Sequence, residues 1–338
     1  MRLSIIPLAI GLILLLAAPE LVPGFIVRLL ILTLLFLVLT EGLDLVTGYA
    51  GLISLGQVVF LGIGGYTSVI LFLDWGLSPL LGMIVGVLFS AAAAVGFGLV
   101  AAKLRGIYFA MGTVGMSSLA SIIAINWSIT GGSIGLGWVV PERPLDLEFT
   151  SVTPYYYLFL AMAIVTVVLI HYLMPTAWGY KLRALGSNET AAKSIGINTT
   201  RVKIEAFVIS AVLTSIMGTL YSFYLAFVSP STFFPIDTTI ELFVIQIIGG
   251  AATLWGPVLG AFILVPLSQA AIIYLGPVVG SLDVAVYSAF LIVFILFCPN
   301  GIMSIISPKG GGRRRILSAE RLSGLLRRAR PEPEAPKG

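Results

Sequence analysis

Long apolar runs constrain this chain more than any other feature of its sequence. The runs at residues 80–102 and 155–174 are each close to the roughly 20 residues that an α-helix needs to cross the hydrocarbon core of a bilayer. In the whole chain 58% of residues are hydrophobic, only 10% are charged, and the mean hydropathy is +1.07. Because a helix satisfies its backbone hydrogen bonds within one segment, lipid selects for it. The sequence therefore predicts an all-α, polytopic integral membrane protein with about ten transmembrane helices, some of them interrupted by glycine.

The apolar runs divide the chain into a membrane domain and a tail. We expect residues 1–306 to form the transmembrane domain, and residues 307–338, which are rich in Arg, Gly and Pro, to form a mobile basic tail in the cytoplasm. The first run follows Arg2 as in a signal peptide, but it leads directly into the next run without a small-residue cleavage site, so we interpret it as a retained span. The expected spans are residues 3–18, 25–40, 42–71, 80–102, 104 onward, 155–174, 204–228, 242–254, 258–274 and 282–297.

The placement of charge predicts the orientation in the membrane. Ten spans bring most Lys and Arg residues to one side, including Lys103, Arg105 and the whole tail, whereas most Asp and Glu residues lie on the other. By the positive-inside rule the basic side is cytoplasmic, so both termini are expected there. The formal net charge of +4 would also suit a nucleic-acid-binding protein. This distribution instead favours a lipid bilayer as partner and no nucleic acid.

Two glycine-rich segments, residues 42–71 and 247–266, interrupt the apolar pattern. Irregular backbone is tolerated in lipid only where protein or a water-filled cavity covers it. These segments therefore form either broken helices beside a translocation pathway or sites of tight helix packing. A short similarity between residues 51–55 and 250–254 indicates an internal repeat. Asp44 is either an intramembrane polar residue of functional interest or the cytoplasmic end of a span, and we favour the second interpretation. The pathway candidates are Gly48, Gly51, Ser54, Gly56, Gly249, Gly250 and Thr253.

A charged segment at residues 181–207 stands out from this apolar background, and its part 181–203 is the expected cytoplasmic loop. Asn188 can cap a helix there, Glu189 lies in its first turn, and Gly196 can end it in the left-handed conformation. A helix of about two turns is too short to be stable alone. Its small apolar face consists of Ala191, Ala192 and Ile195. Such a helix either docks against a soluble protein on the same side or remains a solvated part of the loop.

Several motifs resemble a known family. The run 189–196, ETAAKSIG, resembles the EAA loop of ABC importer permeases, with Thr190 inserted between the Glu and the Ala pair. Three longer stretches and one short one are similar to the branched-chain amino-acid permease family of LivM type: the flanking RALGSNETAAKSIGINTTRVKIEAFVISA, the run GYAGLISLGQVVFLGIGGY, the run IIGGAATLWGPVLGA and the closing PNGI. The similarity extends over nearly all of residues 25–302.

This resemblance implies a function. It implies the membrane-spanning permease subunit of an ABC importer in the bacterial inner membrane, which translocates branched-chain amino acids with energy from ATP hydrolysis in separate subunits. It also implies three kinds of partner: a second permease subunit of LivH type, two ABC ATPase subunits, and a periplasmic amino-acid-binding protein. The residues that would couple this subunit to the ATPase are Glu189, Ala191, Ala192, Ile195 and Gly196.

The chain has no recognisable machinery for chemistry of its own. The string closest to a phosphate-binding loop, GSNETAAKS, has Ala192 where the second Gly is needed. The sequence contains one His and one Cys, Cys298, and no HExxH motif. We therefore expect no enzyme activity, no cofactor and no metal site. Two alternatives stay open, namely a self-sufficient secondary transporter or channel, and an ABC permease for urea or another small amide.

Overall fold

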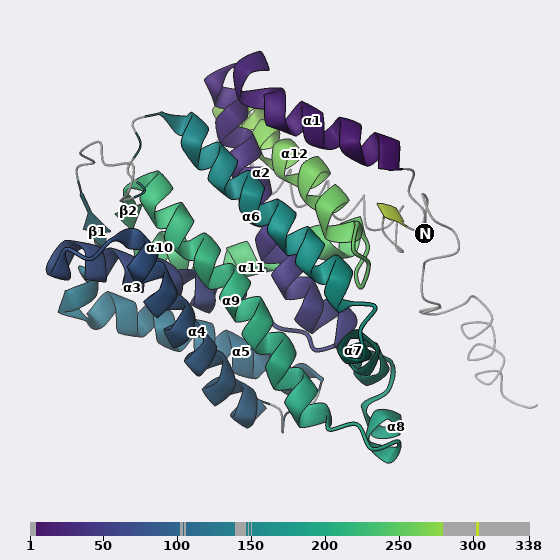
Figure 1. Cartoon of the computed structure of the whole chain (residues 1–338). Helices are drawn as coiled ribbons and strands as arrows, with labels where there is room; N and C mark the ends of the chain where they lie inside the picture. Colours follow the sequence, from purple (N-terminus) through teal and green to yellow (C-terminus); the bar gives the residue numbers. More distant parts are fainter. Residues whose placement is uncertain are drawn as a thin grey trace, which may run out of the picture.

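The computed structural model describes residues 5–101, 104, 106–138, 147, 149, 151–279 and 302–303, and their side chains except in 5–10, 101 and 271–279. Figure 1 shows a bundle of long helices with two shorter helices at one end. The long helices are α1 Ile5–Leu21, α2 Gly24–Asp44, α3 Gln57–Trp75, α4 Pro79–Ala101, α5 Ile107–Asn126, α6 Val152–Leu173, α9 Thr199–Leu225, α11 Ile236–Gly249 and α12 Gly256–Val279. The shorter elements are α7 Ala177–Ser187, α8 Glu189–Ser194, α10 Pro230–Phe233, and the strands β1 Leu136–Gly137 and β2 Phe227–Val228.

The apolar runs form helices of membrane-spanning length. Within the described ranges, seven helical segments are long and apolar enough to cross a bilayer: Gly24–Tyr49, Gln57–Trp75, Pro79–Val100, Ile107–Asn126, Val152–Leu173, Thr199–Leu225 and Pro230–Gly249. Two further apolar helical stretches, Gly11–Leu21 and Gly256–Ala270, are shorter. The expected tenth span, residues 282–297, and the basic tail lie outside the described residues. The all-α, polytopic fold class is thus confirmed, and seven of the ten expected spans have the required length and composition.

Two of the predicted boundaries were wrong. The expected third span started at residue 42, but α2 continues to Asp44, a π-helical turn occupies Leu45–Tyr49, and α3 begins only at Gln57. The expected eighth span was placed at residues 242–254, whereas α11 begins at Ile236 and ends at Gly249. Both errors have one cause. Hydropathy does not distinguish an apolar helix from an apolar segment of irregular backbone, and here the glycines interrupt the helix.

Helix α9 lies at the centre of the bundle, where it packs along α3, α4 and α2. Close approach of the backbones depends on small residues, because a Cβ on Gly64 would overlap the carbonyl oxygen of Ser215. The Gly82/Gly86 pair in turn brings α4 onto α3, since a Cβ on Gly86 would lie 3.2 Å from the Cα of Gly64. These glycines serve helix packing, one of the two roles that the sequence left open.

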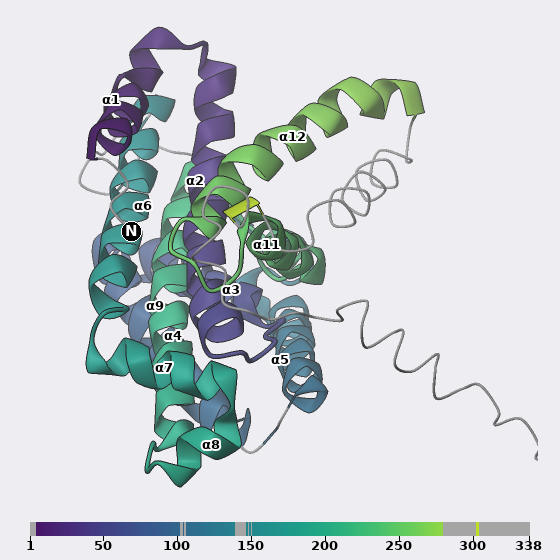
Figure 2. The same ribbon diagram turned by 90° about the vertical axis from the view of Figure 1, so that its right-hand side faces the viewer.

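The helix ends define two ends of the molecule. Figures 1 and 2 show α7 and α8 together at one end, where α6 ends and α9 begins. At its other end α9 runs into β2, which pairs antiparallel with β1 in the register Leu136 to Val228. The helix α3 also stops at this second end, because Gly76 adopts a left-handed φ of 63° and its N–H bonds back to the carbonyl of Phe72. The segment that the sequence marks as charged therefore lies at the end opposite the two strands.

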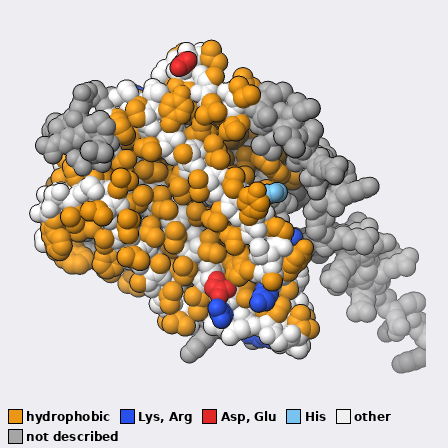
Figure 3. Space-filling view, in the orientation of Figure 1, with side chains coloured by type: hydrophobic (Ala, Val, Ile, Leu, Met, Phe, Trp, Pro, Cys, Tyr) orange, Lys and Arg blue, Asp and Glu red, His pale blue; other side chains and the backbone are white. Residues whose placement is uncertain are grey.

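The outer surface is apolar, as a lipid-facing surface must be. In Figure 3 hydrophobic side chains cover the middle of the molecule, and charged side chains gather near the end that carries α7 and α8. Large apolar side chains are exposed along α4 and α5, among them Leu88, Phe89, Leu99, Met111 and Leu119. Patches of this size on a soluble protein would cause aggregation. In a bilayer they are solvated by acyl chains.

Candidate translocation and coupling site

The first glycine-rich segment forms an interruption between α2 and α3. After the π-helical turn, residues 50–56 are non-helical, and Gly51 has a φ of 71° that L-residues rarely adopt. Side chains of α5 satisfy the exposed backbone groups at Leu55: its N–H donates to Thr113 Oγ1 at 2.9 Å, and its carbonyl accepts from Ser117 Oγ at 3.3 Å. A broken helix in this position is therefore stabilised by polar residues of its neighbour.

The second glycine-rich segment forms an interruption between α11 and α12. Gly250 and Ala252 both have positive φ, 123° and 58°, and end α11 abruptly. Thr253 closes the turn, because its hydroxyl donates to the carbonyl of Gly250 at 2.6 Å and accepts from the N–H of Gly256 at 3.1 Å. The expectation of a second Gly-interrupted helix is confirmed, and the threonine supplies the hydrogen bonds that the helix loses.

The two interruptions lie side by side. Asp44 Oδ1 accepts hydrogen bonds from the backbone N–H of Ala252 at 2.9 Å and from Gln246 Nε2 at 2.6 Å. A Cβ on Gly48 would lie 2.6 Å from the nitrogen of Ala252, so Gly is required for this approach. Asp44 is the last residue of α2, yet its side chain is fully buried. Asp44 thus lies at the end of α2, as expected, but hydropathy could not show that a segment 208 positions away covers its side chain.

The remaining pathway candidates separate into three places. Gly51 is exposed and lies against α7, where a Cβ would be 3.2 Å from the Cα of Gly186. Ser54 is buried and its N–H bonds to Thr47 Oγ1, whereas Gly56 is buried against α5, where a Cβ would be 3.1 Å from the carbonyl oxygen of Thr113. Gly249 and Gly250 are buried at the junction of α11 and α12. The structure thus brings Gly48 next to the second interruption, while Gly51 contacts α7 and Gly56 contacts α5.

The predicted helix in the charged loop is present as α8. Asn188 caps it, since its Oδ1 accepts from the N–H of Ala191 at 3.1 Å. Gly196 ends it with a φ of 84°, and its N–H bonds to the carbonyl of Lys193 while that of Ile197 bonds to Ala192. The sequence missed the longer amphipathic helix α7 that precedes it. Trp178, Leu182 and Leu185 of α7 pack into a cluster of buried apolar side chains in the core.

The expected apolar face of α8 is divided between two directions. Ala192 is buried against the rest of the chain, whereas Ala191 is exposed and Ile195 is 74% exposed. Glu189 forms two ion pairs within the chain: its carboxylate binds Lys193 Nζ at 2.9 Å and Lys203 Nζ at 3.0 Å. Burial raises the pKa of Glu189, but the hydrogen bonds and charges of Lys193 and Lys203 outweigh this and hold the pKa below its usual range. One apolar side of α8 remains open while its acidic residue faces α9.

The charged end touches the first interruption directly. A Cβ on Gly186 of α7 would overlap the carbonyl oxygen of Tyr49, and the guanidinium carbon of Arg183 lies 5.6 Å from the centroid of the Tyr49 ring. The backbones of α7 and of residues 49–51 are therefore in close contact. Sequence reasoning missed this contact. A glycine near the end of a helix has no distinctive signal for the partner that it meets.

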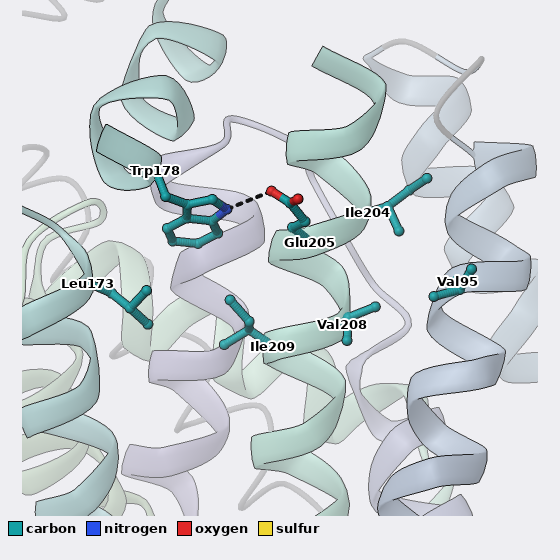
Figure 4. Close-up of a pocket in the computed structure, with 7 residues that line it drawn as sticks. All are labelled: Val95, Leu173, Trp178, Ile204, Glu205, Val208 and Ile209. Carbon is teal, nitrogen blue, oxygen red and sulfur yellow. Dashed lines mark hydrogen bonds between the residues drawn. The ribbon is translucent and has the colours of Figure 1, made fainter. Parts of the chain in front are cut away.

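A shallow groove runs beside this end of α9 between α4 and α6 (Figure 4). It has a volume of about 380 Å³ and is lined by Val95, Leu173, Trp178, Ile204, Glu205, Val208 and Ile209. Trp178 and Glu205 point toward one another, and Trp178 Nε1 donates to Glu205 Oε2 at 3.0 Å. The walls are otherwise apolar, so this groove lacks the polar groups expected of an amino-acid site. Its hydrogen bond ties α7 to α9.

Comparison with known proteins identifies the family. The sequence model described as the branched-chain amino acid transport system / permease component matches residues 25–298. The chain belongs to this family. The permease is 30% identical over 262 residues to the high-affinity branched-chain amino acid transport system permease protein LivM of Salmonella typhimurium, and 29% identical over 258 residues to that of Escherichia coli. Each match covers 69% of this permease and 60% of the relative, so the chain spans less than two thirds of the length of these relatives.

Two further similarities are more distant. The permease is 28% identical to the autoinducer 2 import system permease protein LsrC of Klebsiella pneumoniae, over 171 residues that cover 48% of this chain and 47% of that protein. Among solved structures, a chain of PsaBC from Streptococcus pneumoniae in complex with Fab has a TM-score of 0.43 and 14% identity, with 82% of this chain and 93% of that chain covered. The family assignment rests on the sequence matches. With the apolar helices, it makes this permease a multi-pass membrane protein.

The described residues offer no group of three or more His, Cys, Asp and Glu side chains that could hold a metal ion. The polar groups at the two interruptions are instead backbone amides, hydroxyls, one amide side chain and carboxylates. Such groups bind and orient a polar molecule by hydrogen bonds. They provide no nucleophile with an adjacent base.

Proposed function

We propose that this chain is the membrane-spanning permease subunit of an ABC importer for branched-chain amino acids. ATP is bound and hydrolysed in separate subunits, and the chain itself catalyses no reaction. Family membership and the match to LivM proteins support the transported class. The proposed partners are a second permease subunit of LivH type, two ABC ATPase subunits and a periplasmic amino-acid-binding protein.

The observation that carries this proposal is the contact between α7 and the first interruption. Gly186 and Arg183 of α7 lie against Tyr49, four residues or fewer from Gly48 and Gly51. The short helix α8 follows α7 directly and exposes Ala191 and Ile195. An ATPase that binds this exposed side would move α7 and α8 as one unit. That movement would reach the broken helix through the backbone contact at Gly186, without any flexible intermediate.

The proposed orientation places α7, α8 and both chain termini in the cytoplasm. The basic residues of the loop, among them Lys181, Arg183, Lys193 and Arg201, support this side by the positive-inside rule. In this arrangement residues 1–306 make up the membrane domain of the inner membrane, and residues 307–338 are the basic tail. The strands β1 and β2 then face the periplasm, where a binding protein would deliver its cargo.

Reconstitution tests the class of transporter. The chain would be co-purified with its proposed partners and placed in liposomes. Radiolabelled leucine and the binding protein would be added outside, on the periplasmic side of the complex, and ATP would be enclosed inside. We expect uptake that requires ATP on the ATPase side and stops when the ATPase subunits are omitted. Uptake by this chain without any ATPase would contradict the proposal and indicate a self-sufficient secondary transporter or channel.

The cargo needs a separate measurement, because the chain is also similar to an autoinducer 2 import permease. Competition against labelled leucine uptake by unlabelled isoleucine, valine, urea and acetamide would rank the candidates. We expect the branched-chain amino acids to compete and the two amides to have no effect. Competition by urea or acetamide alone would replace the amino-acid assignment with that of a small-amide permease.

A further inference from the structure

Two carboxylates of the membrane-spanning helix α2 are completely buried. Glu41 and Asp44 lie three residues apart, so their side chains project from the same side of the helix, and both have no exposed surface. The segment Gly24–Tyr49 that contains them is apolar enough to cross the bilayer. Buried ionisable residues within such a segment are costly, and they generally mark a function.

These carboxylates lack positively charged partners. Within the described part of the chain neither forms an ion pair, and both oxygens of Glu41 have no hydrogen-bond partner. Asp44 uses only Oδ1, for Gln246 and Ala252, and its Oδ2 has no partner. The side-chain oxygen of Gln246 is also buried without a partner. This small region of α2 and α11 thus presents several hydrogen-bond acceptors and very few donors.

The surrounding backbone adds to the negative potential. α11 ends at Gly249, so this helix directs the negative end of its dipole toward the region. An uncompensated charge in a low-dielectric interior is strongly destabilising. The unpaired acceptors therefore call for a ligand that brings both positive charge and hydrogen-bond donors.

We propose that Glu41 and Asp44 bind the primary ammonium group of a ligand at the junction of the two interrupted helices. An ammonium group carries one positive charge and three N–H donors. Those three donors match the three unpaired carboxylate oxygens of the pair. A calcium ion would require about six to eight oxygen ligands, which is more than the unpaired acceptors identified here supply.

The cargo of the proposed function is one source of this group, since every amino acid carries an α-ammonium. That part of the inference rests on the proposed function, whereas binding of a free ammonium compound does not. Gly48 lies one turn after Asp44, and its contact with Ala252 joins the site to the second interruption. A movement of residues 49–51 by α7 would therefore alter access to the carboxylates, which links the site to the coupling end.

The experiment measures thermal unfolding of the full-length chain in lipid nanodiscs at constant ionic strength and pH. Wild-type protein is compared in methylammonium chloride and sodium chloride, and in leucine and 4-methylpentanoate, which lacks the ammonium group. We expect methylammonium and leucine to raise the unfolding temperature, and sodium and 4-methylpentanoate to leave it unchanged. If methylammonium raises the unfolding temperature and leucine does not, the result would support the ammonium site and count against amino acids as cargo. Equal effects of methylammonium and sodium, or no effect of methylammonium and leucine, would overturn the proposal.

Variants place the effect at the two carboxylates. Glu41→Gln and Asp44→Asn keep the side-chain size, and we expect each to raise the methylammonium concentration needed for half-maximal stabilisation at least tenfold. Asp74→Asn, which alters an exposed residue in the last turn of α3, is the matched control and should bind methylammonium as wild type does. In ammonium-free buffer Glu41→Gln should unfold at no lower temperature than wild type, because it replaces a buried carboxyl group that has no partner with a neutral amide of the same size. Unchanged stabilisation in both variants would refute the assignment, and if neither folds, the wild-type comparison decides alone.

Discussion

Lys203 of α9 donates a hydrogen bond of 3.0 Å to Glu189 of α8, and the lysine side chain is only 3% exposed. The pair joins the short helix at the coupling end to the central helix of the bundle. Because an ammonium group this deeply buried depends on its carboxylate, α8 is held in place by a charge that the loop itself supplies.

Replacement of Glu189 by Gln should destabilise the chain by about 1–3 kcal/mol, since it leaves Lys203 with a neutral acceptor in a buried position. Unfolding of the purified chain in denaturant, followed by circular dichroism, measures the difference. Arg201→Gln is the control, because it removes only an exposed pair with Glu205 and should cost about 0.5 kcal/mol or less. Equal effects of the two substitutions would contradict a special role for the buried pair.

The same ion pair predicts a dependence on pH. The pKa of Glu189 is lower in the folded chain than its ordinary value of 4.5, so the folded state binds its proton less readily than the unfolded state. Its contribution is therefore complete above pH 4.5 and is lost as the pH falls through the folded-state value. The stability difference between wild type and Glu189→Gln should be constant near neutral pH and shrink in acid. A difference that grows on acidification would show that the sign is wrong.

Gly186→Ala should impair coupling, because the added methyl group would overlap the carbonyl oxygen of Tyr49 and push α7 away from the first interruption. We expect a loss of about 1–3 kcal/mol in stability from overpacking and a lower ratio of leucine taken up to ATP hydrolysed. Gly115→Ala is the matched control on α5, where a Cβ would meet nothing within 4 Å. It should be neutral or stabilise by about 0.5–1 kcal/mol. Normal coupling in Gly186→Ala would remove the contact from the mechanism.

Gly196→Val should reduce uptake per ATP hydrolysed while membrane insertion remains normal. The left-handed φ of 84° costs an L-residue about 1–2 kcal/mol, although a Cβ at this position would meet no other atom. The end of α8 would therefore change without any clash in the core. Gly196→Asn, which tolerates this conformation, should retain uptake. If both variants transport leucine as wild type does, the shape of the α8 end is not needed for coupling.

A cysteine at Ser187 should react with an impermeant maleimide only from the cytoplasmic side. Ser187 is exposed at the end of α7, next to the Asn188 cap. The natural Cys298 would first be replaced by Ser, which leaves a single thiol for labelling. Labelling in inside-out vesicles and protection in intact spheroplasts is the expected result. Labelling of intact spheroplasts would reverse the orientation and exclude a cytoplasmic ATPase as the partner of α8.

Some elements of the fold could be predicted from the sequence because the signals that specify them are local. Asn188 and Gly196 lie within a few residues of the backbone groups that they cap, so they predicted α8 and its ends. Apolar runs predicted the spans for the same reason, since crossing a bilayer is a property of one segment. The interruptions at Gly51 and Gly250 were expected from glycine content, although their exact bounds were not.

The candidate site depended on contacts that no local signal specifies. Asp44 and Ala252 are separated by 208 positions, and only the folded chain brings the second interruption over the carboxylate. The burial of Glu41 was likewise missed. In a soluble helix a polar face indicates water, but lipid-facing and protein-facing sides of a membrane helix are both apolar, so hydropathy does not tell which side is covered.

The sequence by itself thus determined that the chain is a bundle of apolar helices with one charged, capped helix in a loop and two glycine-rich segments that interrupt the apolar pattern. Only the tertiary structure decided that the breaks adjoin, that α7 touches the first of them, and that Glu189 is tied to Lys203. Propensity, capping and hydropathy act between neighbours in the chain. Which buried surfaces meet depends on close packing between distant segments, where a single missing Cβ, as at Gly48 or Gly186, permits the contact.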